Sequence, residues 1–471
     1  MLLRLRPPKI TVCIPTYNQA RYLGDAIRSA LAQTEADFEL VVYDDASTDE
    51  TPAVIASFQD PRIRSFRQTQ NVGIARNRNS CVSVARGRYL AWLDGDDVYR
   101  PNMLALQAAV LDGDPRVGLV HGNHDVIGDD GRALPDWEPP FRQDTVERGE
   151  VAFRELMLAN YITAPTVLIR RECYDCVGGY AQELSRSGED WELWLRVALH
   201  FDIAYTSARV ASYRQHAESS SNGTVASGVR VRLDIAAIKR VFDPGRNLPI
   251  PDRNALRRSA SAALAVKALV HAGSAFVTGN RTAALRSAVQ AFRQYPLLAR
   301  RREAGRLLLS ILTRDEYANY RHTKSLLAVL HRSLDGSRFA DRIRKLSVSD
   351  PAWEQCVRDV AGIVKRRVPP GAQVAVVDKH DPTLLHLCGR SGWHFPDLRS
   401  LPTGYPTDSE EAVEHLEMLR RKGARYLVFP NHAYWWLEHY DGLARQLETS
   451  STVVWDDDRC QIYELAAPVA S

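Results

Sequence analysis

The sequence contains no long apolar run and little that is typical of an exported chain. Its 471 residues nowhere offer the about 18 consecutive apolar residues that a membrane-spanning helix requires. The N-terminal segment, Met1-Leu-Leu-Arg-Leu-Arg-Pro-Pro, lacks the apolar core and cleavage site of a secretory signal. The seven cysteines are an odd and scattered set, which favours reduced thiols over a disulfide framework. We therefore expect a cytoplasmic protein without a membrane span.

Net charge is also small, at +4, but it is distributed unevenly along the chain. Residues 246–345 contain 20 Lys and Arg against 6 Asp and Glu, whereas the remainder contains 41 against 51. Two interpretations of the basic segment stay open. It contacts something anionic, such as phospholipid headgroups or a polyprenyl-phosphate acceptor at the inner face of a membrane, or it is a solvated spacer whose arginines pair with the acidic remainder. We expect no nucleic-acid partner.

The hydrophobic pattern divides the chain into three parts. Residues 1–245 alternate short apolar runs, at 10–14, 38–43 and 89–93, with helical patterns, which predicts an α/β domain on a mainly parallel sheet. A Pro-rich linker at 244–252 introduces a basic helical region, 246–350. Strand patterns return at 373–377, 425–429 and around 455–458, with a helix at 410–422. Residues 351–471 are therefore predicted to form a small α/β domain, to which no chemistry can be attached.

Each of the first three predicted strands ends in a polar cluster, where open α/β sheets bind ligands. Pro15-Thr-Tyr-Asn18 offers an aromatic ring that could stack on a base, and Asp44-Asp-Ala-Ser-Thr-Asp49 offers carboxylates for an imide N–H. Asp94-Gly-Asp-Asp97 is the strongest signal, because carboxylates two apart can hold Mg²⁺ or Mn²⁺, which would stabilise a leaving diphosphate. Asp456-Asp-Asp458 has similar spacing, but its predicted hairpin favours a solvated turn.

Six motifs in order resemble those of the family 2 glycosyltransferases of GT-A fold, across some 200 residues of the first half. The six are Pro15-Thr-Tyr-Asn, Asp44-Asp-x-Ser-x-Asp, Asn71-Val-Gly-Ile-Ala-Arg-Asn77, Leu93-Asp-Gly-Asp-Asp97, Gly188-Glu-Asp-Trp-Glu-Leu-Trp-Leu-Arg196 and Tyr213-Arg-Gln-His216. The resemblance implies a GT-A nucleotide-sugar-binding domain and an inverting glycosyltransferase, with UDP-sugars as the expected donors. Bacterial relatives extend lipid-linked or surface polysaccharides, so a glycan or lipid-linked acceptor is implied as well.

The resemblance also implies a role for each residue of the site. Pro15, Tyr17 and Asp45 would bind the base of the donor. Arg76 would approach its phosphates, and Asp94 would lie near ribose and metal. Asp96 would coordinate the cation, Mn²⁺ or Mg²⁺, and His216 would be a further ligand unless it is a surface histidine of a polar loop.

Asp190 is the candidate general base. An inverting transfer needs one carboxylate to take the proton of the acceptor hydroxyl, and the family places it at the Asp of this Glu-Asp pair. The alternative is that Glu189 and Asp190 are acidic residues favoured by a helix N-terminus. Trp191 and Trp194 share one helix face, which favours core packing over sugar stacking.

Three function classes remain open at this point. An active transferase is favoured because Asp45, Asp94, Asp96 and Asp190 are all present, and a nucleotide-sugar-binding module without turnover would often have lost one. A nucleotidyltransferase would be expected to show a Gly-rich basic loop after the first strand, which the sequence lacks. Cys173 and Cys176 have the spacing of zinc and redox sites, but no second pair accompanies them, so we interpret both as core residues.

Overall fold

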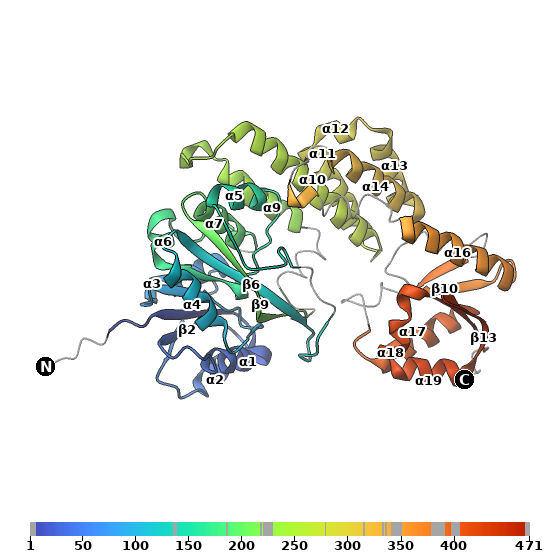
Figure 1. Ribbon diagram of the computed structural model, residues 1–471, viewed down its shortest axis with the longest axis horizontal. Helices are drawn as coiled ribbons and strands as arrows, with labels where there is room; N and C mark the ends of the chain where they lie inside the picture. Colours follow the sequence, from blue (N-terminus) through green and yellow to red (C-terminus); the bar gives the residue numbers. More distant parts are fainter. Residues whose placement is uncertain are drawn as a thin grey trace. The chain divides into compact units, whose positions relative to one another are not determined.

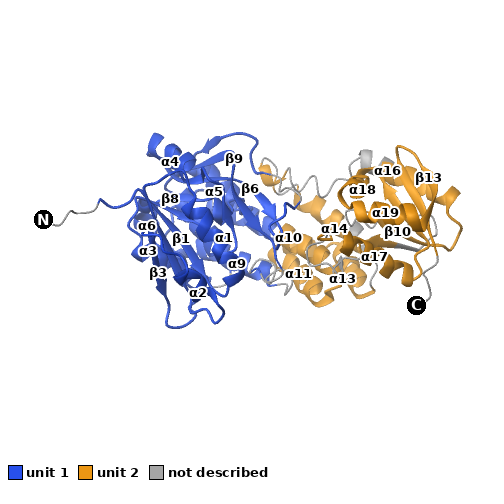
Figure 2. Cartoon of the chain, turned by 90° about the horizontal axis from the view of Figure 1, so that it is seen from below, with its two compact units in different colours: residues 1–225, 229–264 blue, residues 226–228, 265–471 orange. Residues whose placement is uncertain are grey.

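The protein consists of two compact units, residues 1–225 with 229–264 and residues 226–228 with 265–471 (Figure 2). The computed structural model describes residues 6–134, 139–184, 187–216, 219, 229–277, 279–313, 316–331, 334, 337–340, 351–377, 391–396 and 406–466. The boundary between the units lies inside the long helix α10 (Arg253–Val277). The division of the chain at residues 245 and 350 stays a prediction.

The first unit is built on a mixed sheet of nine strands, of which the first four in the spatial order β3-β2-β1-β4 are parallel. The order continues with β8, β6, β9 and β5, and β7 pairs with β9. The strands are β1 (Ile10–Thr16), β2 (Phe38–Asp44), β3 (Ile63–Arg67), β4 (Tyr89–Trp92), β5 (Val98–Tyr99), β6 (Val117–Ile127), β7 (Thr145–Glu147), β8 (Leu168–Arg170) and β9 (Asp202–Arg214). The α/β class predicted from the alternating pattern is confirmed.

Helices cover both faces of this sheet (Figure 1). They are α1 (Ala20–Leu31), α2 (Thr51–Ala56), α3 (Ile74–Val84), α4 (Met103–Gly113), α5 (Gly149–Leu156), α6 (Arg171–Val177), α7 (Glu189–Ala198) and α9 (Arg230–Val241), with short 3-10 turns at Ala164–Thr166 and Pro244–Arg246. Alternate residues of β1, such as Val12 and Ile14, pack with α1 and α4 in one core, because successive side chains of a strand point to opposite faces. The other face meets α6, where Trp92 donates to the Tyr174 hydroxyl at 2.9 Å.

The strand order reverses at β1. The chain goes from β1 to β2 and β3 on one side and then returns to β4 on the other side. In parallel α/β sheets ligands bind beyond the carboxyl ends of the strands at such a switch point. The register aligns Thr16 with Asp44 and Cys13 with Trp92, so the loops that follow β1, β2 and β4 emerge at one edge. The first three polar clusters of the sequence therefore meet there.

The second unit contains helices followed by a five-stranded sheet of order β11-β10-β12-β14-β13. The elements after α10 are α11 (Arg281–Gln294), α12 (Pro296–Ala299), α13 (Arg302–Thr313), α14 (Glu316–His331), α16 (Pro351–Arg367), β10 (Gln373–Val377), β11 (Ser391–Phe395), α17 (Ser409–Arg421), β12 (Tyr426–Pro430), a 3-10 turn (Asn431–Ala433), α18 (Trp435–His439), α19 (Asp441–Ser450), β13 (Ser451–Asp456) and β14 (Cys460–Leu465). Ala375 and Val377 face the core with α17 to α19, whereas Val374 and Val376 face α16. The helical region and the small α/β domain expected from the sequence are both present. Over the described ranges, no helix is long and apolar enough to cross a membrane.

Candidate active site

The loops after β1 and β2 are tied together by their own polar side chains. The backbone N–H of Asn18 donates to Ser47 Oγ at 2.9 Å, and that of Ala20 donates to Asp49 at 3.0 Å. Asn18 itself adopts φ 52°, and its side-chain oxygen accepts from Thr48 N–H at 2.8 Å. These contacts use most of the small polar residues for loop structure. Tyr17, in contrast, is left 44% exposed at the edge of the sheet.

Asp45 closes a second loop, although it was predicted to contact the base of the donor. Its two carboxylate oxygens accept from the backbone N–H groups of Val72 and Gly73 at 2.8 and 2.9 Å. Gly73 has φ 85°, a left-handed conformation that favours glycine, and it precedes helix α3. Asp45 therefore connects the end of β2 to the start of the helix that carries Arg76 and Arg78.

Arg78 is the cation at the centre of the site. Its side chain is 4% exposed and binds Asp94 through Nη2, at 2.8 and 3.1 Å from the two oxygens. The guanidinium also lies over the rings of Trp92 and Tyr180, at 5.2 and 5.6 Å from their centroids. Burial raises the pKa of Asp94, and the Arg78 charge opposes that effect. Asp94 is thus held in a fixed position at the end of β4.

Asp96 and His216 lie together beside this pair. His216 Nε2 is 3.0 Å from Asp96 Oδ2, and the imidazole packs on Tyr22 with 4.6 Å between ring centroids. Arg214, two residues before His216, donates from Nε to the backbone oxygen of Asp96 at 2.8 Å and lies over the same tyrosine ring at 5.1 Å. Arg214 N–H also donates to Asp97 at 2.7 Å. The end of β9 is thereby fixed against the Asp94–Asp97 turn.

The protein atoms available as metal ligands fit a divalent cation that takes most of its ligands from substrate and water. Asp96 and His216 offer one oxygen and one nitrogen at a common point, whereas Asp94 faces Arg78. Among the described residues, no three His, Cys, Asp or Glu side chains converge as a complete metal site. A cation such as Mg²⁺ commonly binds one or two carboxylates and completes its shell with substrate phosphates and water. The arrangement suits that mode and not an all-protein cage.

Glu189 and Asp190 begin helix α7 on the other side of Arg78. Arg78 Nε is 3.6 Å from Glu189 Oε1, and the charge of Asp190 acts on both Arg78 and Asp94. Burial, together with Asp190, raises the pKa of Glu189 to about 7. Glu189 is buried and Asp190 is partly exposed, so Asp190 is the more accessible of the two carboxylates. The helix N-terminus thus presents a carboxylate at the same edge as Asp94 and Asp96.

Comparison with known proteins identifies the family of the chain. Residues 11–178 match the model of glycosyl transferase family 2. An uncharacterized protein of Mycobacterium tuberculosis is 30% identical over 240 residues, which are 48% of this chain and 73% of that protein. The chain belongs to glycosyl transferase family 2.

Other relatives of this glycosyltransferase match over a smaller fraction of both chains. An uncharacterized glycosyltransferase of Rickettsia felis is 30% identical, over 45% of this chain and 35% of the relative. The succinoglycan biosynthesis protein ExoO of Rhizobium meliloti is 40% identical, over 27% of this chain and 36% of the relative. The chain therefore spans only about a third of these two relatives.

Solved structures of similar architecture include TarS 1–349 of S. aureus in complex with UDP-GlcNAc. It has 19% sequence identity and a TM-score of 0.47, over 67% of this chain and 91% of that one. The mannosyltransferase PcManGT of Pyrobaculum calidifontis, in complex with GDP-Man and Mn²⁺, has 20% identity and a TM-score of 0.42, over 73% and 88%.

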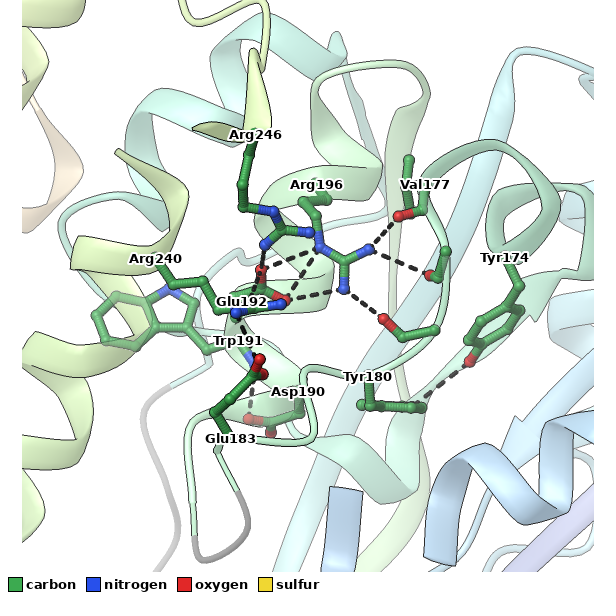
Figure 3. Close-up of polar contacts among 12 residues, drawn as sticks. Tyr174, Val177, Tyr180, Glu183, Asp190, Trp191, Glu192, Arg196, Arg240 and Arg246 are labelled. Carbon is green, nitrogen blue, oxygen red and sulfur yellow. Dashed lines mark hydrogen bonds and ion pairs between the residues drawn. The ribbon is translucent and has the colours of Figure 1, made fainter. Parts of the chain in front are cut away.

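In this glycosyltransferase a buried charge cluster holds helix α7 (Figure 3). Glu192 is fully buried and pairs with Arg196 at 2.8 Å, with Arg246, and with Arg240 at 3.5 Å. Figure 3 shows the Arg196 guanidinium reaching from this carboxylate to the backbone oxygens of residues 177–179. Arg240 lies on α9, and Arg246 lies in the predicted linker. The helix that carries Asp190 is therefore fixed by segments that lie beyond the matched residues 11–178.

Seven of the eight predicted site residues of this glycosyltransferase lie at one edge of the sheet. The sheet edge brings together those at the ends of β1, β2, β4 and β9 and at the start of α7: Pro15, Tyr17, Asp45, Asp94, Asp96, Asp190 and His216. Pro15 is buried within β1, in register with Tyr43, and Arg76 is exposed on α3. The roles assigned to all eight residues stay predictions.

The sequence analysis missed Arg78, Arg214 and Glu192. Helical periodicity was a usable signal for Arg78, which follows Ala75 and precedes Cys81 by three residues each and so continues the buried face of α3. Glu192 and Arg196 have the (i, i+4) spacing of a helical ion pair. Arg214 stands within the motif Tyr213-Arg-Gln-His216, which was a usable signal for it.

Two further interpretations can be checked directly. Trp191 and Trp194 are 2% and 0% exposed, which confirms core packing. Cys173 is buried against Gly118, but Cys176 is exposed on α6, so its assignment to the core was wrong. Helix α6 has only seven residues and packs with one face, and a residue three positions after Cys173 already lies near the edge of that face.

Proposed function

We propose that this enzyme transfers a sugar from a nucleotide-sugar donor, of which UDP-sugars are the first candidates, to a hydroxyl of a glycan or lipid-linked acceptor with inversion at the anomeric carbon. One observation carries the proposal. Asp190 lies within the same group of interacting charges as Arg78, Asp94 and Asp96, at the switch point of the sheet. Under this proposal Asp190 would supply the base at the edge where the diphosphate of the donor would bind.

The residues of this chain would divide the work as follows. Tyr17 would stack on the base at the open end of β1, and Asp94, fixed by Arg78, would contact the ribose. Asp96 and His216 would hold Mn²⁺ or Mg²⁺, which as a Lewis acid stabilises the charge of the departing diphosphate. Asp190 would accept the proton of the acceptor hydroxyl as that oxygen attacks the anomeric carbon opposite the leaving group.

Substitution of the base tests this proposal. Asp190→Asn retains the shape and the acceptor oxygen toward Trp191 N–H, but an amide cannot take a proton at neutral pH. We expect kcat to fall about 10²- to 10⁴-fold while the affinity for the nucleotide, measured by calorimetric titration, is unchanged. NMR of the product should show the inverted anomeric configuration. Equal turnover by the variant would remove Asp190 from the mechanism, and a retained configuration would exclude single displacement.

The donor and the acceptor class need separate experiments. A panel of nucleotide sugars can be tested by thermal shift with and without Mn²⁺. The true donor should raise the melting temperature of the protein more than the corresponding free sugar does. If a donor binds but no acceptor supports transfer, the chain acts as a binding module without turnover. Transfer to a lipid-linked glycan in preference to the free glycan would support the lipid-linked acceptor.

A further inference from the structure

Helices α11 to α13 carry an unusual surface. Residues 281–313 contain seven arginines, no lysine and a single acidic residue, Glu303. Arg281 has a structural role, because its guanidinium donates to the backbone oxygens of Ile311 and Leu312 at the end of α13, at 3.3 and 2.6 Å. The start of α11 is thereby fixed to the end of α13. The six remaining arginines are exposed: Arg286, Arg293, Arg300, Arg301, Arg302 and Arg306.

These six arginines form no ion pair with any described part of the chain. The alternative that the basic segment pairs with the acidic remainder therefore holds for Arg246, which pairs with Glu192, but not for these six. A guanidinium keeps its charge at any physiological pH and matches phosphate oxygens with two parallel N–H groups. Six such groups within 21 residues of sequence are therefore available to an anionic partner.

Leucines are exposed among the same arginines. Leu309 and Leu297 are 58% and 57% exposed, which are the two highest values for large hydrophobic residues in the described part of the chain, and Leu312 is 53% exposed. On α13 the residues Arg302, Arg306, Leu309 and Leu312 recur at helical spacing along the solvent side, whereas Leu307 and Ile311 are buried on the opposite side. One helix face thus combines cations with apolar side chains.

We propose that the exposed surface of α11 to α13 docks on an anionic lipid bilayer. The arginines would contact headgroup phosphates, and the leucines would enter the boundary between headgroups and acyl chains, as in helices that lie in the membrane interface. A fluid bilayer accepts charged and apolar groups side by side without a matching shape, whereas a protein partner would need a pocket for each leucine. Charge complementarity requires an anionic partner, and the exposed leucines among the arginines favour lipid over an acidic protein. The proposal does not depend on the proposed function, because binding is measured without turnover.

Vesicle flotation of the full chain tests the proposal. We expect the protein to float with vesicles of phosphatidylcholine and phosphatidylglycerol but not with phosphatidylcholine alone, and high salt should weaken binding. Replacement of Arg300, Arg301 and Arg302 by Glu should weaken it by about 100-fold or more, since each basic residue near an anionic surface contributes about fivefold. The double variant Leu297→Ser and Leu309→Ser should reduce binding about tenfold or more, also at high salt.

A charge-matched variant provides the control. Arg116, Arg132 and Arg445 are exposed and paired with nearby carboxylates, so their joint replacement by Glu changes the net charge equally but leaves α11 to α13 intact. It should bind vesicles far better than the triple variant of residues 300–302. Equal losses would overturn the proposal, as would binding to phosphatidylcholine alone or binding independent of salt. Capture by polyglutamate without any vesicle binding would assign the surface to an acidic protein instead. Thermal melting of each variant establishes that it is folded.

Discussion

Arginine has opposite environments in the two units of this chain. In the first unit Arg78, Arg196 and Arg214 have side chains no more than 4% exposed, and each contacts carboxylates and neighbouring backbone or aromatic groups. The six arginines of residues 286–306 are exposed, and their side chains form no hydrogen bond or ion pair with the described residues, whereas Arg281 is half-buried and bonded to α13. A buried cation must be compensated within the protein, because desolvation is costly. The first set therefore fixes geometry, and the second set is available for a partner.

Acidic clusters show the same difference. Asp94 and Asp96 are held by Arg78, His216 and Arg214, whereas the side chain of Asp458 in the β13–β14 turn is 94% exposed. Sequence spacing alone makes the two clusters look similar. Arg459 pairs with Asp457 and Asp458 as well, but its side chain is 44% exposed, so what separates the two clusters is the burial of the partners that hold each carboxylate.

The largest effect is expected for Asp96→Ala. If Asp96 holds the cation as proposed, its loss removes several kcal/mol of transition-state stabilisation, which is about 10³-fold or more in kcat/KM. Steady-state transfer with Mn²⁺, and after chelation and re-addition of the metal, measures it. Asp458→Ala is the matched control and should retain full activity. Full turnover of the Asp96 variant in EDTA would refute the assignment of the metal to this residue.

The next largest effect is expected for Glu192→Gln, on the free energy of unfolding. It leaves Arg196 buried beside Arg240 and Arg246 without a carboxylate, and breaking a buried ion pair costs about 3–5 kcal/mol of the free energy of unfolding. Urea unfolding measures the change. Glu183→Gln removes a 69% exposed partner of the same Arg240 and should cost less than about 1 kcal/mol. Equal losses in the two variants would mean that the buried cluster does not hold α7.

Arg78→Lys should reduce kcat by about 10- to 100-fold. Lysine keeps the charge but not the planar fork that fixes Asp94 while lying over Trp92, and hydrogen bonds to charged groups contribute about 1.5–3 kcal/mol. The exposed Arg76 is the neighbour for comparison. Arg76→Lys should change kcat/KM less than about threefold, because lysine keeps the positive charge that the predicted phosphate contact of the exposed Arg76 requires. The reverse order of effects would assign the central role to Arg76.

The sequence was sufficient for the fold class and for the edge at which the site lies. Buried strands such as β1 are continuous apolar runs, and parallel order places the polar residues that follow them together. The short strands β3 and β11 were not predicted, since Ile63–Arg67 alternates with arginine at the sheet margin and β11 has two of its five positions taken by Gly392 and His394. Neither pattern is apolar enough to indicate a strand.

Partners across the fold could not be predicted from the sequence. The carboxylate of Asp45, whose contact with the donor base stays a prediction, accepts from residues 72 and 73, which are 27 and 28 positions away. Arg246 was interpreted as part of a linker, and it reaches Glu192 across 54 positions. Contacts at such separations depend on how helices pack, and local periodicity carries no information about them.

The smallest effect is expected for a buried imidazole, that of His124, whose neighbours do not offset the cost of burying its positive charge. His124 lies on β6, and burial lowers its pKa to about 4, although the neighbouring Asp125 acts in the opposite direction. His124 therefore stays neutral in the folded chain at pH values where the histidine of the unfolded chain, with its ordinary pKa of 6.5, binds a proton. The unfolded state binds more protons between pH 6.5 and 4, so the free energy of unfolding falls as the pH is lowered through that window and is fully retained above it. Between pH 7 and 5 this effect lowers the free energy of unfolding by about 1–2 kcal/mol.

Urea unfolding at the two pH values measures the effect. In His124→Gln the free energy of unfolding should fall less by that amount, while the exposed His200→Gln should follow the parent chain. If both variants keep the parent's slope, His124 is charged in the folded protein and Asp125 compensates it as carboxylates compensate Arg78 and Arg196.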